Sequence, residues 1–463
     1  MTAAANRSAN GQIYIGLDFG MALTKVAVWA KLAQERDPTR FVIEFPRDND
    51  PANPADKNRA VHVPSALWVG NGKIYGIPTN GTRRLNRIDG IKKMMLDSWN
   101  GAATLGAPTI HTLGGLSGWN AEKLAILKLA FVLRYVDMKL EQLSARTRVG
   151  ARWSKLINAA IPPEEGEFQV SSPRTKRMRS VLERAWSLIP KIGSAEQGLS
   201  LADALKLVDS VYSNPLTADS QTPVEVIPEA LAAACFKITS DDAKPGNWLT
   251  VDVGALTTDT SYFFFNPDPV FQIACYSTLQ SKQVGTEGLV RAGHIVEIKG
   301  RGYLPHEAIA QETTLATTHE NYDCVVQGVL GAVKCAVKGA IIHHGSKVAS
   351  VIADGRPQFN IMLVGGGSVN KAISPKIHGW TFPGLGPVEC AVCSTAQLPR
   401  VVKLLSAESL LREGAIPPND HAILTIAVGL AQPRIDLPRW CTSAPTPKWK
   451  VKEPPDNPYV GHN

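Results

Sequence analysis

The sequence predicts an α/β protein of two related halves, and two observations support this prediction. Residues 13–29 have the pattern of an apolar strand that ends at Asp18, a tight turn and a second apolar strand. Residues 247–265 repeat this order, with Asp252 at the end of the first strand. Two such hairpins in one chain indicate a duplicated architecture, and the helical patterns between them make it a mixed α/β one.

The two hairpin tips carry residues that suit the binding of a polyphosphate. Gly20 and Gly254 allow backbone N–H groups to approach phosphate oxygens, and Thr257 adds a hydroxyl donor. Asp18 and Asp252 are each expected to hold a hydrated divalent cation, since Mg²⁺ prefers oxygen ligands and retains several waters. A single Asp-x-Gly is only a strand end and a turn, but two copies with matching strands favour a binding site.

Length and composition are those of a folded protein with two domains or one large bilobal domain. The 463 residues are 44% hydrophobic and 19% charged, which favours a sizeable core. The net charge of +8 permits contact with nucleic acid or acidic membranes but does not indicate either. The densest basic cluster, residues 174–179, lies where a helix begins, and we interpret it as a solvated helix face.

The seven cysteines do not predict a disulfide framework, because their number is odd and the chain is long. Cys390 and Cys393 form a single C-x-x-C with no second pair nearby, so two ordinary thiols are favoured over a zinc or redox site. Residues 1–11 lack the apolar segment of a secretory signal, and no run of about 18 apolar residues predicts a membrane-spanning helix. We therefore expect a cytoplasmic protein.

Strands and helices are expected to alternate in the first half of the chain. Apolar, β-prone segments at 12–45, 61–76 and 154–161 predict strands, and Gly70-Asn71-Gly72 predicts a hairpin turn within the second segment. Apolar residues recur at helical spacing in 119–148, which predicts a long core helix. The remaining predictions are a loop at 46–60, helical or irregular structure at 83–99, a glycine-rich loop at 101–118, and helices at 173–190 and 198–212.

The second half begins where residues 224–236 pass from a strand into an alanine-rich helix with Pro228 at its head. After the central hairpin, residues 358–364 predict a third apolar strand that leads into Gly365-Gly366-Gly367-Ser368. The remaining predictions are helices at 321–345, 401–412 and 420–431, interrupted structure at 380–400, and a tail from 432 onward.

Five segments, taken in order, resemble the five motifs of the actin-like ATPase superfamily, which includes sugar kinases, actins and the seventy-kilodalton heat-shock chaperones. The matching segments are 18–20 and 252–259 for the two phosphate motifs, 228–233 and 420–431 for the two connecting helices, and 363–368 for the adenosine motif. Together they extend over nearly the whole chain.

Two details make the chain most similar to the ATPase domain of the chaperones, in a divergent branch without a peptide-binding domain. The sequence from Pro228 to Ala233 is similar to the Glu-Pro-x-Ala-Ala-Ala signature, and Val63-Pro64-Ser65 together with Lys92-Lys93 is similar to the chaperone first lobe. Because only about 30 residues follow Gly429, we expect an ATPase domain that stands alone.

The resemblance implies an actin-like fold, in which two lobes enclose a central nucleotide cleft and each lobe has a mixed sheet of ribonuclease-H-like type. The domain bounds that it implies are 12–236 with 418–435 for the first lobe, about 41–114 for a small subdomain within it, 247–415 for the second lobe, about 285–320 for a shortened upper subdomain, and 436–463 for a tail.

The resemblance further implies ATP or ADP with Mg²⁺ as ligands, and Asp18 and Asp252 as residues that hold the metal through water. Glu229 would position the attacking water, Lys25 would neutralise charge on the γ-phosphate, and Asp252 would complete the catalytic set, with Lys92 or Lys93 as alternatives to Lys25. The implied nucleotide-binding residues are Asp18, Gly20, Thr24, Lys25, Gly254, Thr257, Gly365, Gly366, Gly367 and Ser368.

Departures from the chaperone pattern bear on hydrolysis. Met21 stands where the chaperones carry threonine, and its thioether cannot donate to a phosphate. Ala255 and Leu256 replace glycines, and Leu256 would crowd a close approach of the backbone to phosphate. Lys25, however, lies near the position where actin keeps a phosphate-contacting lysine. We therefore predict nucleotide binding with slow hydrolysis.

The predicted function is that of a chaperone-like ATPase, a nucleotide-dependent switch that acts on a partner protein. The alternatives are a pseudo-ATPase interaction module, an actin-like filament protein and a small-molecule kinase of the sugar-kinase branch, for which no sugar-pocket signature is present. The sequence contains neither a P-loop nor a Gly-x-Ser-x-Gly elbow, which argues against P-loop NTPases and α/β-hydrolases.

Overall fold

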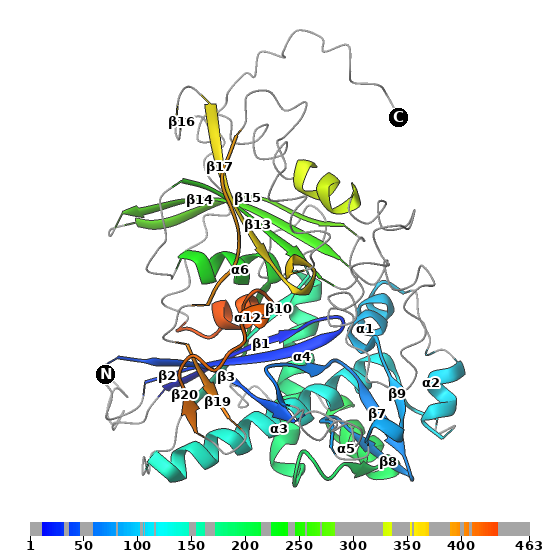
Figure 1. Ribbon diagram of the computed structural model, residues 1–463. Coiled ribbons are helices and arrows are strands. Elements are labelled where there is room, and N and C mark those ends of the chain that lie inside the picture. The colour runs from blue at the N-terminus through cyan, green and yellow to red at the C-terminus, as the bar shows by residue number, and fades with distance from the viewer. Residues whose placement is uncertain are drawn as a thin grey trace, which may run out of the picture.

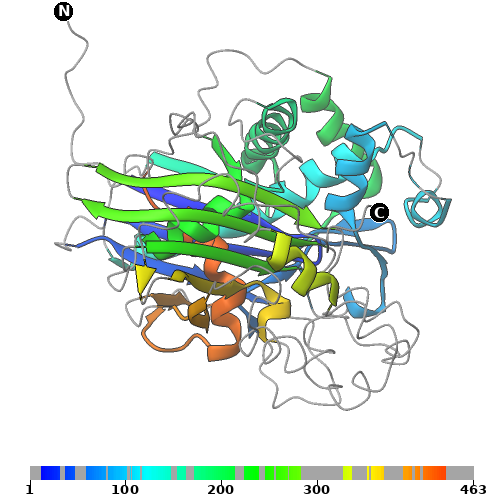
Figure 2. The ribbon, with the colours of Figure 1, turned by 90° about the horizontal axis from the view of Figure 1, so that it is seen from above.

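Two mixed β-sheets and the helices around them make up the described part of the chain (Figure 1). In the view from above, the long strands of the second sheet overlie those of the first (Figure 2). Mixed sheets and helices in one chain confirm the α/β class predicted from the sequence. The residues described in this computed structural model are 12–31, 37–46, 59–79, 82–101, 105, 107–114, 117–147, 154–162, 172–213, 224–238, 246–254, 257–268, 271–282, 327–335, 352–353, 356–369, 389–398, 402–406 and 410–433.

The first sheet contains eight of the described strands. They are β1 (Gln12–Phe19), β2 (Leu23–Ala30), β3 (Thr39–Ile43), β6 (Val63–Pro64), β10 (Ser154–Ile161), β12 (Val224–Pro228), β19 (Lys403–Leu405) and β20 (Leu411–Arg412). Their order is β12-β10-β1-β2-β3-β19-β20, and β6 pairs with the start of β2. The β1–β2 pair is the hairpin predicted at residues 13–29, which the structure confirms.

The second sheet contains six of the described strands, in the order β15-β14-β13-β17-β16, with β18 also paired to β17. They are β13 (Gly246–Val253), β14 (Thr258–Asp268), β15 (Phe271–Lys282), β16 (Ile352–Ala353), β17 (Arg356–Val364) and β18 (Glu389–Thr395). The β13–β14 pair confirms the second predicted hairpin, and β17 confirms the predicted third apolar strand.

The two sheets share one strand arrangement. In the first, β3, β2 and β1 are successively antiparallel, and β10 and β12 then continue in parallel to β1. In the second, β15, β14 and β13 are antiparallel, and β17 and β18 continue in parallel to β13. The duplication inferred from the two hairpins therefore extends to five strands of each sheet.

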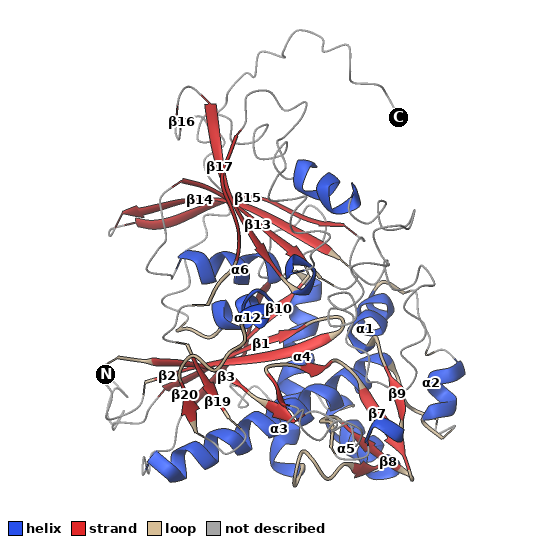
Figure 3. Ribbon diagram, in the orientation of Figure 1, coloured by secondary structure: helices blue, strands red, loops and turns tan. Residues whose placement is uncertain are grey.

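Helices α6 (Glu229–Ile238) and α12 (Pro418–Leu430) form a layer between the two sheets (Figure 3). They cross at very short distance, because a Cβ on Gly429 of α12 would lie 2.0 Å from the carbonyl oxygen of Ala232 in α6. Asn158 of β10 holds the C-terminal end of α12 by donating to the carbonyl oxygens of Leu430 and Gln432, at 2.8 and 2.9 Å. Helices are thus present in both segments that the resemblance assigned to connecting helices, and the two pack together.

The other described helices are α1 (Ile91–Trp99), α2 (Ala107–Thr112), α3 (Ala121–Thr147), α4 (Pro173–Leu188), α5 (Leu201–Tyr212), residues 327–335, and the 3₁₀ turns η1 (Thr82–Arg84), η2 (Ile189–Lys191) and η3 (Gly366–Val369). Ser172 and Ser200 cap α4 and α5 by accepting hydrogen bonds from the backbone N–H groups of Thr175 and Asp203. The long apolar stripe predicted for 119–148 is confirmed as α3.

Two small sheets complete the first half. One has the order β11-β8-β7-β9, and the other pairs β4 with β5. Their strands are β4 (Phe45–Pro46), β5 (Arg59–Ala60), β7 (Leu67–Gly70), β8 (Lys73–Tyr75), β9 (Asn86–Ile88) and β11 (Leu199–Ser200). The β7–β8 pair confirms the hairpin predicted at Gly70-Asn71-Gly72.

Strand β1 is buried on both faces, which explains its nearly continuous apolar sequence. Ile13, Ile15 and Leu17 belong to a core cluster shared with α3 and α4. Tyr14, on the other face, belongs to a second cluster built around α6, α12 and the second sheet. Alternate side chains of one strand thus join the two cores.

The predicted helix at 401–412 is wrong, because β19 and β20 form an antiparallel hairpin there. Strand β19 pairs in parallel with β3, so these residues extend the first sheet although the sequence assigned 247–415 to the second lobe. A short apolar run fits a helix or a strand equally well, and here the open edge of β3 decides. Two further differences are strand β18 within 380–400 and helix α2 within the predicted loop at 101–118.

Several predictions fall on residues outside the described ranges. These are the shortened subdomain at 285–320, the tail at 436–463, most of the loop at 46–60, and all of the 321–345 helix except the helical residues 327–335.

Candidate functional site

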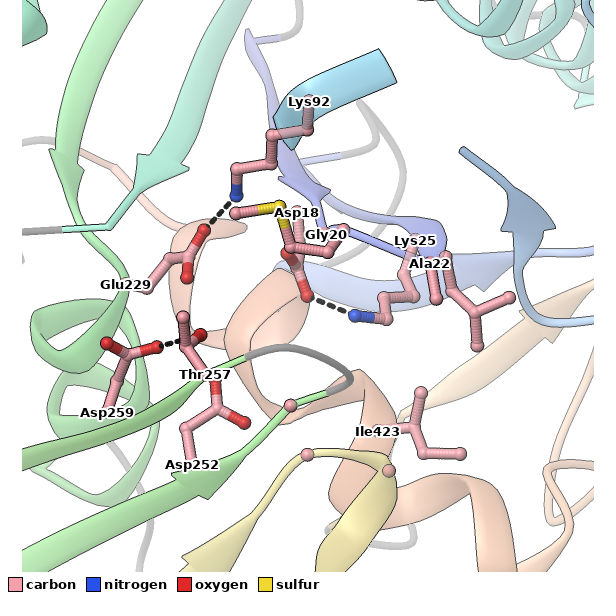
Figure 4. A pocket seen from close by; sticks show the side chains of 15 residues that line it. Asp18, Gly20, Ala22, Lys25, Lys92, Glu229, Asp252, Thr257, Asp259 and Ile423 are labelled. Atoms are coloured by element: carbon pink, nitrogen blue, oxygen red, sulfur yellow. Dashed lines mark hydrogen bonds and ion pairs between the residues drawn. The ribbon is translucent and has the colours of Figure 1, made fainter. Parts of the chain in front are cut away.

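A pocket lies where the tips of the β1–β2 and β13–β14 hairpins face each other (Figure 4). Its lining also includes residues of α1, α6 and α12 and the turn that follows β17. The empty space between the lining residues is about 630 Å³, a figure that includes space open to solvent.

The two hairpin tips are built alike. In each, the glycine N–H donates to the carbonyl oxygen three residues ahead: Gly20 to Leu23 at 3.0 Å, and Gly254 to Thr257 at 2.9 Å. Both glycine N–H groups are therefore engaged within the turn and are not the donors available to a phosphate. The glycines instead let each turn close tightly, because a Cβ on Gly20 would lie 2.6 Å from the carbonyl oxygen of Leu23 and one on Gly254 would lie 3.1 Å from that of Thr257.

The strand register makes individual residues of the two tips equivalent. Asp18 is the cross-strand partner of Lys25 in the first hairpin, and Asp252 is the cross-strand partner of Asp259 in the second. Lys25 and Asp259 thus occupy matching positions with opposite charges. The first hairpin presents one carboxylate and one ammonium group to the pocket, whereas the second presents two carboxylates.

Lys25 forms an ion pair with Asp18, with Nζ 2.7 Å from Oδ2. Asp18 is only 2% exposed, and the lysine side chain is 12% exposed. Burial alone would lower the pKa of Lys25, but the carboxylates of Asp18, Asp252 and Glu229 outweigh this effect and raise it. Lys25 is therefore a permanent cation of the pocket.

Lys92 of α1 forms a second ion pair, with Oε1 of Glu229 at the first turn of α6. Both side chains are buried. Burial, with the carboxylates of Asp259 and Asp18, raises the pKa of Glu229 to about 7 against the opposing effect of Lys92. Glu229 is thus able to exchange a proton near neutral pH.

Asp252 has no such partner. It is 7% exposed and lines the pocket, and none of the residues that the structure describes donates a hydrogen bond to its carboxylate. Burial raises its pKa well above the usual range, and Asp259 and Glu229 add to this effect while Lys25 opposes it. Gly365 makes room for this carboxylate: its φ is +81°, and a Cβ there would lie 2.0 Å from Asp252 Oδ1.

Three buried carboxylates are close enough to share a cation. Oxygen atoms of Glu229, Asp252 and Asp259 all lie within 4.8 Å of one another. Thr257 donates from Oγ1 to Asp259 Oδ2 at 2.9 Å, which orients that carboxylate. Carboxylate oxygens are the ligands that Mg²⁺ and Ca²⁺ prefer, and a divalent cation would relieve the mutual repulsion of these three carboxylates.

Asp259 is the site residue for which sequence reasoning assigned no role. A signal was present, because Asp259 follows Asp252 by the same interval that separates Lys25 from Asp18. In a returning strand it also shares a face with Thr257, which was assigned to the site.

The structure brings most of the predicted site residues into this one pocket. Those that line it are Asp18, Gly20, Lys25, Glu229, Asp252, Gly254, Thr257, Gly365 and Gly366, and Lys92 and Met21 line it as well. Gly367 is not part of the lining. The side chain of Ala255 and that of Leu256 lie outside the described residues.

Two predicted nucleotide contacts have hydroxyl groups engaged elsewhere. Thr24 is fully buried, and its Oγ1 lies 2.8 Å from Oγ of Ser65, the residue that follows β6. Ser368 is also fully buried and donates to the carbonyl oxygen of Gly365 at 2.7 Å. Neither lines the pocket, and both support its walls instead. Lys93, the alternative to Lys92, pairs with Asp97 on the half-exposed face of α1.

The chain matches no model of a known protein family and no curated protein. Among the described helices, none combines the length and apolarity needed to cross a membrane.

Proposed function

We propose that this chain is an actin-like, chaperone-related ATP-binding protein that holds a nucleotide and a divalent cation between its two hairpin tips. One observation carries the proposal: Asp18 and Asp252, at equivalent positions of two hairpins in similarly arranged sheets, face a single pocket. A duplicated sheet with a polar pocket between the two copies is the architecture that the sequence resemblance implies.

The residues around the pocket have distinct roles under this proposal. Lys25 and Lys92 offer positive charge to a polyphosphate, and Gly365 and Gly366 face the nucleoside. Of the two aspartates predicted to hold the metal, Asp252 is the better placed, because Asp18 already accepts a hydrogen bond from Lys25. A bound divalent cation would neutralise charge on the phosphates and polarise them.

Glu229 is the group that bears on hydrolysis. With a pKa of about 7 and a position in the pocket lining, it accepts a proton from a water molecule at neutral pH without needing a strong base nearby. The hydrogen bond from Lys92 holds the carboxylate of Glu229 in one orientation. Met21 provides no hydroxyl at the first tip, so hydrolysis is slow, and the slow change between nucleotide states serves as a switch on a partner protein.

A second candidate function is a pseudo-ATPase, an interaction module that binds nucleotide without turnover. The observation that favours it is the thioether of Met21 in the pocket lining, at a tip where a phosphate donor is expected. The two functions share the same binding site and differ only in the chemical step.

The test is nucleotide binding by calorimetry and turnover of ATP by the purified protein, each with and without Mg²⁺. Asp252→Ala should weaken Mg²⁺-dependent ATP binding by a factor on the order of ten or more, the scale of one charge-assisted contact. Glu229→Ala should abolish hydrolysis in a protein that still binds ATP. The matched control is Glu196→Gln, which changes an exposed carboxylate outside the pocket.

Measurable turnover that Glu229→Ala abolishes supports the ATPase. Binding without turnover in either protein supports the pseudo-ATPase. Failure to bind ATP or ADP at millimolar concentration rejects both.

A further inference from the structure

The two hairpins differ in how their charges are balanced. In the first, Lys25 neutralises Asp18 at 2.7 Å, with both groups largely shielded from solvent. In the second, the position that matches Lys25 carries Asp259, so Asp252 and Asp259 face the pocket as two carboxylates. The first hairpin therefore brings its own cation at this position, and the second does not.

The remaining groups of the pocket do not correct this imbalance. Lys92 is paired with Glu229, which leaves Asp252 without a lysine or arginine ion pair among the described residues. Thr257 orients Asp259 but brings no charge. Asp252, 7% exposed and directed into the pocket, receives no hydrogen bond from the described residues. A buried carboxylate of this kind is stable in its charged form only beside a positive partner.

We propose that the ammonium group of Lys25 takes the place of a metal ion beside Asp18. The site then binds a single exchangeable divalent cation, which is held by Asp252, Asp259 and Glu229. The three carboxylates have oxygen atoms within 4.8 Å of one another and supply the hard ligands of such an ion. This inference deepens the proposed function and rests on it for the role of the cation, but not for the number of cations bound.

The replacement of Lys25 by a neutral residue is the informative change. Without the ammonium group, Asp18 becomes a second buried carboxylate that faces the pocket without a partner, opposite the first. It should then recruit an exchangeable cation of its own. The wild-type chain has one site because the other is filled by a side chain.

The experiment counts bound Mn²⁺ by electron paramagnetic resonance on the metal-free, nucleotide-free protein. The wild-type chain should bind one ion, and Asp252→Asn should weaken that binding at least tenfold. Lys25→Met should bind two ions, and the double variant Lys25→Met/Asp18→Asn should return to one. Lys25→Arg, which keeps the charge, should also bind one, and Glu196→Gln should match the wild type.

A wild-type count of zero or two overturns the inference, as does unchanged Mn²⁺ binding by Asp252→Asn or a count of one for folded Lys25→Met. Circular dichroism establishes that each variant is folded, and Lys25→Gln replaces Lys25→Met should the latter not fold. ATP binding is measured separately on the same samples. If the Mn²⁺ counts are as predicted but ATP does not bind, the proposed function is rejected and this inference stands. If ATP binds but the counts differ, the proposed function stands and this inference is rejected.

Discussion

Lys92 of α1 and Glu229 of α6 form a buried ion pair between helices that lie far apart in the sequence. The pair joins α1, which packs on α3, to the helix layer between the two large sheets. A buried pair of this kind is costly to break on one side, because the remaining charge has no partner. It therefore couples the position of α1 to the state of the pocket.

Removal of Lys92 should destabilise the protein in a pH-dependent way. Lys92→Met leaves the carboxylate of Glu229 without its cation, at a cost of about 3–5 kcal/mol when that carboxylate is charged. At pH 6 Glu229 can take up a proton, so the loss should be smaller than at pH 8. Urea unfolding of Lys92→Met and wild type at both pH values measures the difference. Equal losses at the two pH values would contradict the assignment, and Lys93→Met, at the half-exposed neighbour, is the control.

The metal-free protein should lose stability as the pH rises through neutrality. The pKa of Glu229 is about 7 in the folded state against an ordinary 4.5, so the folded state holds this proton more tightly than the unfolded state. The resulting stabilisation is complete below the ordinary pKa and is lost as the pH rises through about 7. For Glu229 alone the change is on the order of 3 kcal/mol.

Asp252 adds a change of the same sign, since burial, then Asp259 and Glu229, raise its pKa. Urea unfolding in chelator-treated buffer at intervals from about pH 5 to about pH 8 tests this prediction. Saturating Mg²⁺ should flatten the profile. A free energy of unfolding that increases with pH over this range would show that the two carboxylates are not buried as described.

Asp252→Asn should stabilise the metal-free fold while it impairs the site. The substitution removes a buried charge that has no hydrogen-bond donor among the described residues, and the amide keeps the shape beside Gly365. We expect a higher melting temperature than wild type at pH 8 and a small difference at pH 5, together with weaker Mg²⁺-dependent ATP binding. Differential scanning calorimetry and binding calorimetry on the same sample measure both. A variant that melts below wild type at pH 8 would mean that Asp252 is a structural residue.

Met21→Thr tests whether a missing hydroxyl limits hydrolysis. Met21 lines the pocket at the tip of the first hairpin, and its thioether donates no hydrogen bond. If the absent donor limits the chemical step, threonine should raise the turnover number by up to about 10²–10³-fold, the scale of one transition-state donor. Met21→Val has nearly the shape of threonine without the hydroxyl and is the matched control. Similar rates for the two variants would favour the pseudo-ATPase.

The sequence was sufficient to predict the parts of the fold whose patterns are local. The two hairpins, whose first strands carry Asp18 and Asp252 near their ends, are predictable because an apolar strand, an acidic residue and a glycine follow one another within a few residues. Strands β19 and β20 were missed because their identity depends on β3, which lies near the opposite end of the chain. Short apolar runs have too little periodicity to distinguish a helix from a strand without that partner strand.

The same limit applies to the site. Residue types predicted which groups meet at the hairpin tips, but not which of them are already paired. The ion pair of Lys25 with Asp18 and the bond between Thr24 and Ser65 depend on register and on side-chain direction. These pairings decide that Asp252, rather than Asp18, remains available, and Asp259 joins it only because β14 returns in register with β13.

Two glycines in helices, Gly429 where α12 crosses α6 and Gly331 elsewhere, have opposite surroundings, so the same substitution to alanine should have different effects at the two positions. A Cβ on Gly429 would lie 2.0 Å from the carbonyl oxygen of Ala232 and 2.9 Å from the backbone nitrogen of Phe236, so Gly429→Ala must push the two helices apart. Overpacking of this kind costs typically about 1–3 kcal/mol.

Gly331, in the helical residues 327–335, offers open space instead, because a Cβ added there would meet no described atom within 4 Å. Gly331→Ala should therefore be neutral or stabilise by up to about 1 kcal/mol through helix propensity. Thermal unfolding of the two variants gives the comparison. Since α6 begins at Glu229 and α12 contributes Ile423 to the pocket, Gly429→Ala should also weaken ATP binding, whereas Gly331→Ala should not. A Gly429→Ala protein with wild-type stability would show that the helix layer is loosely packed and cannot transmit a change in the pocket to the two sheets.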